Sequence, residues 1–169
     1  MMGDAFSLPP GVALWFLPFA LPICLWAAWS DISTMKIPNK AVLALVGVFA
    51  VVGLIALPLP DYAWRWTHLG VVLLLGFVLS SFGLLGAGDA KFAAAMAPFV
   101  ALPDAGRFLM LMAAVMLAAF VIHRLLRASP AVRARTPGWE SWTRGRQFPL
   151  GLALGPGLIF YLALAAFGG

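Results

Sequence analysis

Long apolar stretches alternate along the chain with short segments that carry charged, glycine or proline residues. A helix that crosses the hydrocarbon core of a bilayer needs about 20 mostly apolar residues. Six stretches approach that length, and they lie at 11–29, 40–57, 68–85, 89–102, 107–126 and 148–167. The pattern therefore predicts an all-α, polytopic membrane protein with about six transmembrane helices.

The fourth of these stretches is the shortest. About 14 residues of helix reach only about 21 Å, whereas the hydrocarbon core is about 30 Å thick. A re-entrant segment is one alternative, but it would place the arginine-rich segment 124–146 outside the cell, against the charge rule for loops. We therefore expect a short span in a locally thinned bilayer.

Composition agrees with a membrane location. The chain is 63% hydrophobic and 10% charged with a mean hydropathy of +1.00, whereas soluble domains carry about 25% charged residues. The net charge of +5 does not indicate nucleic-acid binding, because the basic residues lie in loops rather than along a polar face. At 169 residues, we expect a single transmembrane domain over 1–169.

The basic residues also predict the orientation. With six spans and the N-terminus outside, only Arg65 and Arg107 lie in outer loops. Cytoplasmic loops would hold the other nine, which are Lys36, Lys40, Lys91, Arg124, Arg127, Arg133, Arg135, Arg144 and Arg146. This is the bias expected of a cytoplasmic face. Segment 127–147 is the one sustained polar tract, and we expect an interfacial helix there around Trp139 and Trp142.

Few residues are suited to metal or cofactor chemistry. Cys24 is the single cysteine, which excludes an internal disulfide and a cysteine-based zinc site. His68 and His123 fall on opposite sides of the predicted membrane, so they cannot share a site, and we interpret them as interfacial anchors. We expect no cofactor, no metal and no nucleic-acid partner.

The acidic residues divide into two groups on this topology. Asp4, Asp61 and Asp104 fall in short outer loops, where solvated carboxylates are ordinary. Glu140 falls in the polar cytoplasmic tract. Asp31 and Asp89 each follow a hydrophobic stretch at its cytoplasmic end, where an ionisable group is costly and is a functional candidate by default.

A pair of carboxylates at one site favours a state in which they share one proton, because both cannot ionise cheaply. The ionised member can then take a proton from water, while the protonated member donates to the oxyanion that forms on a carbonyl. Asp31 and Asp89 could form such a pair. The alternative is that each aspartate pairs with a nearby lysine, Lys36 or Lys91, or caps a helix.

The surroundings of both aspartates favour the catalytic interpretation. Gly86 and Gly88 permit a break in helical geometry beside Asp89. After Asp31, Pro38 forces a turn and Asn39 can cap the next helix, so we expect a loop that holds Asp31 in place.

These residues resemble the type IV prepilin peptidases, a branch of the GxGD intramembrane aspartyl proteases. The segment from Asp31 to Asn39, ending in Ile-Pro-Asn, is similar to the first family motif, and the segment from Gly86 to Lys91 is similar to GxGDxK. A third element near the C-terminus runs from Phe148 through Pro149 to Gly151, with Leu150 where the family usually has an aromatic residue.

The resemblance implies a function for the aspartates. Asp31 and Asp89 would be the catalytic pair of an aspartic endopeptidase in the bacterial inner membrane. Its substrate would be a prepilin or pseudopilin of a type IV pilus or protein secretion system, cut after a glycine that joins a short basic leader to a hydrophobic helix. Lys36, Lys91, Pro38, Asn39, Gly86, Gly88, Pro149 and Gly151 would support the site.

The resemblance also limits the expected scope. Larger relatives carry an additional cytoplasmic domain with paired CxxC motifs and methylate the new N-terminus, whereas this chain has one cysteine. We therefore expect a peptidase without methyltransferase activity, similar to the short enzymes of Flp/Tad-type pilus systems. Two alternatives from other classes are a proton- or cation-coupled transporter subunit that uses the same aspartates, and a non-catalytic assembly factor.

Overall fold

The computed structural model of the chain describes residues 6–144 and 147–168. Over these residues the chain forms helices and turns without a β-strand, which confirms the all-α prediction. Arg146, which was used to predict the orientation, and Asp4, which we placed in an outer loop, lie outside the described residues.

Four helical segments of the described chain are long and apolar enough to cross a membrane. They are α1 (Pro10–Thr34), α2 (Asn39–Ala56), α3 (Leu59–Ser81) and α5 (Ala105–Ala128) together with the preceding 3₁₀ turn η2 (Leu102–Asp104). The shorter elements are α4 (Ala87–Met96), η1 (Ala97–Phe99), α6 (Pro130–Arg135), η3 (Glu140–Trp142) and α7 (Gly151–Phe167).

Of the six predicted spans, four thus correspond to helices that are long and apolar enough to cross a membrane. α7 is apolar but has 17 residues, and the 10 residues of α4 reach only about 15 Å. A membrane-crossing role for these two helices, and the outside position of the N-terminus, remain predictions.

The N-terminal boundary of α3 differs from the prediction, and the additional turns of the helix contain a buried arginine. The helix begins at Leu59 rather than at residue 68, and it contains Arg65, which we had expected in an outer loop. Arg65 is 7% exposed, and its Nη1 donates hydrogen bonds to the carbonyl oxygens of Pro98 and Phe99 at 3.2 and 3.3 Å. The charged group is therefore satisfied inside the protein, which average hydropathy along the chain cannot detect.

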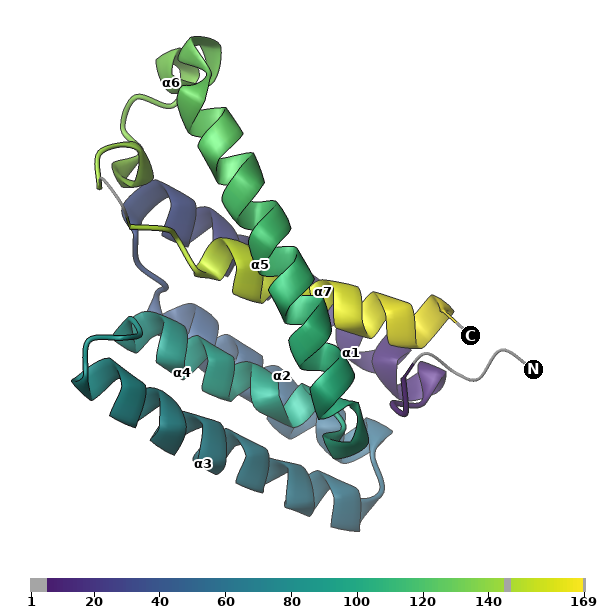
Figure 1. Cartoon of the computed structure of the whole chain (residues 1–169). Coiled ribbons are helices and arrows are strands. Elements are labelled where there is room, and N and C mark those ends of the chain that lie inside the picture. Colours follow the sequence, from purple (N-terminus) through teal and green to yellow (C-terminus); the bar gives the residue numbers. More distant parts are fainter. Residues whose placement is uncertain (1–5, 145–146, 169) are drawn as a thin grey trace.

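The helices form two packed groups (Figure 1). α7 lies along α1, and α4 lies against α2 and α3, while α5 leans across α7. Small residues allow the close approaches. A Cβ atom at Gly155 of α7 would overlap the backbone carbonyl of Cys24 in α1, and one at Gly76 of α3 would press on Ala90 of α4. Within each group the helices thus meet along their backbones rather than through long side chains.

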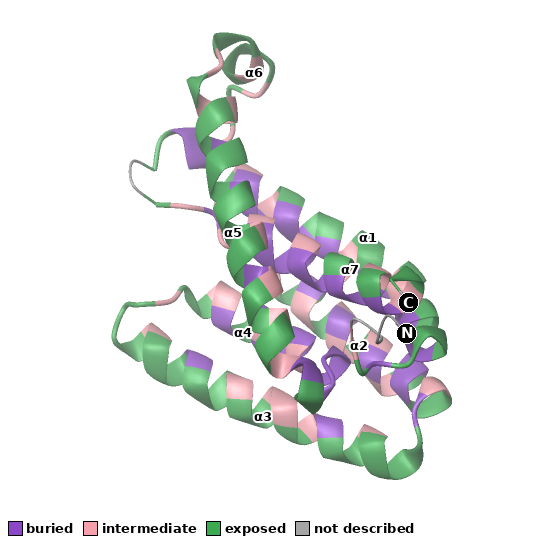
Figure 2. Cartoon of the chain, turned by 45° about the vertical axis from the view of Figure 1, so that its right-hand side comes forward, coloured by how far each residue is buried: buried purple, intermediate pink, exposed green. Residues whose placement is uncertain are grey.

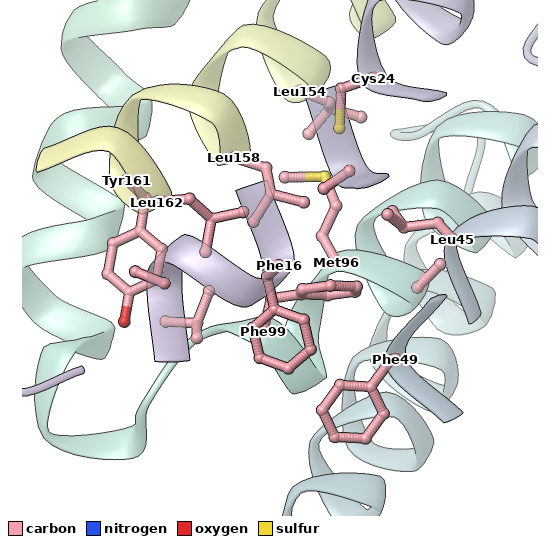
Figure 3. Packing of buried hydrophobic residues seen from close by; sticks show 14 of the residues in the cluster. Phe16, Cys24, Leu45, Phe49, Met96, Phe99, Leu154, Leu158, Tyr161 and Leu162 are labelled. Atoms are coloured by element: carbon pink, nitrogen blue, oxygen red, sulfur yellow. The ribbon is translucent and has the colours of Figure 1, made fainter. Parts of the chain in front are cut away.

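Aromatic rings fill the space between the groups (Figure 3). The ring of Phe16 lies 4.8 Å from that of Phe99 and 5.9 Å from that of Phe49. In contrast, most of the outward side of α3 and of α5 is exposed (Figure 2), and the exposed side chains are largely apolar. This inside-to-outside arrangement suits a protein whose solvent is lipid.

Asp104 is not the solvated loop residue that we predicted. It is 0% exposed and accepts hydrogen bonds from the backbone N–H groups of Ser7 and Leu8, at 2.6 and 3.0 Å, and from the Tyr161 hydroxyl at 2.8 Å. Tyr161 Oη in turn accepts from the N–H of Ala101 at 3.1 Å. Asp104 therefore ties the segment before α1 to the last helix, α7, a contact between parts of the chain far apart in sequence.

Replacing Asp104 should destabilise the fold. Asp104→Ala removes the acceptor of three donors, and we expect the free energy of unfolding to fall by about 3 kcal/mol. Asp61→Ala, at an exposed carboxylate in the first turn of α3, is the control and should cost less than about 1 kcal/mol. Reversible unfolding in mixed detergent micelles measures both, and equal losses would contradict the role given to Asp104.

Candidate active site

Asp31 lies inside α1, three residues before its end, rather than in the loop that we predicted would hold it. The helix continues to Thr34 and terminates at Met35, whose backbone is in the left-handed region at φ 54°. The extension matters because it buries the carboxylate against neighbouring helices. Asp31 is only 4% exposed.

The first residue of α7 provides the hydrogen-bond partner of Asp31. The N–H of Gly151 donates to Asp31 Oδ2 at 2.7 Å. The first N–H groups of a helix have no partner within the helix, and the helix dipole favours negative charge near them. Pro149, which is buried, leads the chain into this position.

Only glycine permits this contact at position 151. A Cβ atom there would lie 2.8 Å from the Cβ of Asp31 and 3.0 Å from its Oδ2. It would also lie 3.0 Å from Cδ1 of Ile37. A side chain at this position would therefore push the start of α7 away from the carboxylate. The structure thus gives a physical reason for the glycine of the third sequence element.

Asp89 lies in the first turn of the short helix α4 and is half-buried. Its carboxylate folds back over Gly86, the residue before the helix, so that a Cβ atom at Gly86 would overlap Asp89 Oδ2. The N-terminal end of α4 favours a negative charge at this place.

The predicted break in helical geometry beside Asp89 occurs at Gly86, whose extended backbone (ψ 138°) precedes α4. Gly86 has an ordinary φ of −65°, and Gly88 is part of α4. The glycine with a left-handed backbone is Gly83, at φ +72°, in the turn after α3. Gly86 is needed for the close approach of a carboxylate, and Gly83 for the turn.

The loop between α1 and α2 is held by side chains of both helices. Ser30 Oγ donates to the carbonyl oxygen of Lys36 at 2.8 Å, and Ile37 is buried. Asn39 does not cap α2 as predicted, because it is the first residue of that helix and its Oδ1 instead accepts from Lys91 Nζ at 3.5 Å. Asn39 thus joins the two predicted motifs.

The structure does not support lysine pairing of the aspartates. Among the described residues, no ion pair joins Asp31 or Asp89 to Lys36 or Lys91. Both lysines have exposed side chains beside the carboxylates. They contribute positive charge to the site without neutralising either aspartate directly.

One pocket of about 550 Å³ brings the two motifs together. Asp31 and Asp89, which are 58 positions apart in the chain (89 minus 31), both line it. The other lining residues are Ser30, Thr34, Met35, Lys36, Ile37, Pro38, Asn39, Gly86, Ala87, Gly88 and Lys91. Pro149 and Gly151 stand behind Asp31 rather than in the lining.

This geometry fits general acid and base catalysis at a carbonyl. Two carboxylates at one pocket share a proton more readily than they both ionise, so one can accept a proton from water while the other donates one. Within the described part of the chain, no three His, Cys, Asp or Glu side chains cluster as they would around a metal ion. The acidic side chains that line the pocket are those of Asp31 and Asp89.

Sequence reasoning missed Ser30, Thr34, Met35 and Ala87 as lining residues. The helical period contains a signal for two of them, because Ser30 precedes Asp31 and Thr34 lies one turn further along α1. That signal requires knowing that α1 continues past residue 29. The hydropathy pattern placed the end of the helix too early.

Glu140 and His123 do not line the pocket. Glu140 is exposed and pairs with Arg144 at 2.7 Å, and this hydrogen bond lowers the pKa of the Glu140 carboxyl. His123 is 2% exposed and stacks on Trp142, so its predicted role as an interfacial anchor is wrong. The helix expected around Trp139 and Trp142 is one 3₁₀ turn, η3.

A comparison with protein families agrees with the two motifs. The model of the type IV leader peptidase family matches residues 18–123, which is more than half of the chain. This range contains both Asp31 and Asp89 but ends before α7. No curated protein and no solved structure matches the chain.

Gly151→Ala should destabilise the protein by crowding Asp31. We expect the free energy of unfolding to fall by about 1–3 kcal/mol, the usual cost of overpacking. The control is Gly47→Ala in α2, where a Cβ atom would meet nothing within 4 Å, and it should leave stability unchanged or raise it by up to about 1 kcal/mol. Unfolding of both variants in mixed micelles tests the close approach, and equal stabilities would disprove it.

Proposed function

Because this chain belongs to the type IV leader peptidase family, we propose that it is an intramembrane aspartyl endopeptidase in which Asp31 and Asp89 activate water. Its substrate is a prepilin or pseudopilin, from which it removes the short leader. The observation that carries this proposal is the pocket lined by both carboxylates.

The two carboxylates take complementary roles in this mechanism. The ionised aspartate accepts a proton from a water molecule, and the resulting nucleophile attacks the carbonyl carbon of the scissile peptide bond. The protonated aspartate donates a hydrogen bond to the oxyanion that develops. The aspartate that accepted the proton then passes it to the amide nitrogen, and the carbon–nitrogen bond breaks. The leader leaves with a new C-terminal carboxylate, and the remaining chain keeps a free amine.

The position of the pocket supports the proposed class of substrate. It lies at the ends of α1 and α4, where apolar helix gives way to the charged residues Lys36 and Lys91. A substrate with an apolar helix in the bilayer and a polar leader outside it would present the junction of the two at this depth. The same basic residues support a cytoplasmic position of the pocket, at the inner membrane of a bacterium.

The proposal covers peptide cleavage without N-methylation. A chain with one cysteine cannot form the paired CxxC motifs of the larger relatives. The reaction needs no cofactor, because both proton transfers are performed by the aspartates. The family match gives no support to the transporter alternative.

Replacing either aspartate should abolish cleavage. Asp31→Asn or Asp89→Asn removes one of the two groups that exchange protons with water and substrate, and we expect the rate to fall by about 10²-fold to 10⁴-fold. Asp61→Asn, at an exposed carboxylate of α3, is the control and should cleave normally. The assay is co-expression with a candidate prepilin and detection of the shortened product on a gel. Continued processing by either active-site variant would rule out the proposal.

Gly86→Ala should reduce kcat while leaving the fold stable. The added methyl group would displace the Asp89 carboxylate, which is the free end of a side chain, and a misplaced catalytic group costs up to about 100-fold in rate. Gly88→Ala is the matched comparison, because its nearest contact would be an ordinary 3.7 Å to Ile37. We expect Gly88→Ala to lose less activity than Gly86→Ala in a purified assay. The reverse order would show that the carboxylate does not act from this position.

A further inference from the structure

Five aromatic side chains form a continuous stack outside the pocket. Trp29 meets Trp139 edge to face with ring centroids 5.0 Å apart, and Trp139 stacks on Trp142 at 5.3 Å. Trp142 also stacks on His123, with ring centroids 5.3 Å apart. His123 in turn meets Phe148 edge to face, with ring centroids 5.7 Å apart. We call these five side chains the aromatic stack.

The two ends of the aromatic stack flank the contact between Asp31 and Gly151. Trp29 lies two residues before Asp31 on α1, and Phe148 lies three residues before Gly151. Between them the stack passes through the segment after α6 and through α5. Figure 1 shows this segment returning from α6 to the end of α1. The stack and the hydrogen bond therefore close a ring of contacts around the end of α1.

The middle of the stack is firmly held. Trp142 is buried, and its Nε1 donates to the carbonyl oxygen and to Oγ1 of Thr136, both at 3.1 Å. His123 is buried beside it on α5. Phe148 has a second aromatic neighbour, Phe120 of α5, at 5.7 Å. The stack thus fixes Phe148 to the long helix α5 and to η3.

The chain that enters α7 depends on such contacts. Phe148 and Pro149 belong to no helix, and α7 begins two residues later with the N–H that binds Asp31. Because Gly151 has no side chain, it makes no side-chain contact that could hold the start of α7 in place. The start of α7 must therefore be placed by its neighbours, and Phe148 is the neighbour with ring contacts to both His123 and Phe120.

We propose that the aromatic stack is a positioning device that holds the Gly151 N–H on the Asp31 carboxylate. Its members do not line the pocket, and they act through the start of α7. The consequence for cleavage rests on the proposed peptidase function, whereas the consequence for the Gly151 amide does not.

The direct test is hydrogen exchange at the Gly151 amide of the full-length protein in micelles, measured by NMR. This amide is protected in the wild type by its bond to Asp31. Phe148→Leu removes the ring that joins the start of α7 to the stack, and we expect exchange at Gly151 to accelerate about threefold to tenfold. The same variant should lower kcat for leader removal by a similar factor and leave KM unchanged.

The matched control is Phe108→Leu. Phe108 is also half-buried, and its ring meets Tyr161 near the other end of α7 at 5.4 Å. This variant should leave the Gly151 amide and kcat as in the wild type. Trp142→Phe keeps a ring in the stack and should also retain protection, whereas Trp142→Leu should lose it.

Three results would overturn the proposal. One is a Gly151 amide that stays protected in Phe148→Leu and Trp142→Leu. Another is equal deprotection in Phe108→Leu, which would indicate general loosening of α7. The third applies if the wild type cleaves its substrate: it is accelerated exchange at Gly151 in Phe148→Leu with a kcat equal to that of the wild type. If the wild type cleaves no prepilin, the proposed function fails, and the exchange measurement still decides the role of the stack.

Discussion

A carboxylate buried between apolar helices needs a hydrogen-bond donor, and this requirement organises the protein. Asp31 meets it with the first N–H of α7, at 2.7 Å. For that N–H to reach the carboxylate, α7 must begin beside the end of α1, and its first residue must lack a side chain. The close backbone packing of Gly155 on Cys24 continues the same approach further along the two helices.

A second buried carboxylate performs the equivalent task at the far end of the same pair of helices. Asp104 binds the N–H groups of Ser7 and Leu8, just before α1, and the hydroxyl of Tyr161 on α7. α1 and α7 are therefore joined by a carboxylate at each end, which sets their relative positions along the axis.

The short helix α4 positions the second aspartate of the pocket, Asp89. It has to bring Asp89 to the same pocket while lying between α2 and α3, and its small residues allow α3 to approach closely. Arg65 of α3 binds the carbonyl oxygens of Pro98 and Phe99 in the turn that follows α4. Both ends of the segment that carries Asp89 are thus defined, one by the loop at Gly83 and Gly86 and the other by a buried arginine.

The amino-acid pattern was enough to predict the helical class, the apolar character of the main helices and the two aspartates as the pair of interest. These properties depend on local composition and on motifs a few residues long, which are visible along the chain. Other features became visible only once the helices were packed: α1 extends past Asp31, Asp104 and Arg65 are buried, and Asn39 binds Lys91. The same is true of the hydrogen bond that the Gly151 N–H donates to Asp31, 120 positions away in the chain. Each of these depends on a partner from a distant segment, and the free energy of burying a polar group is set by that partner rather than by its neighbours in sequence.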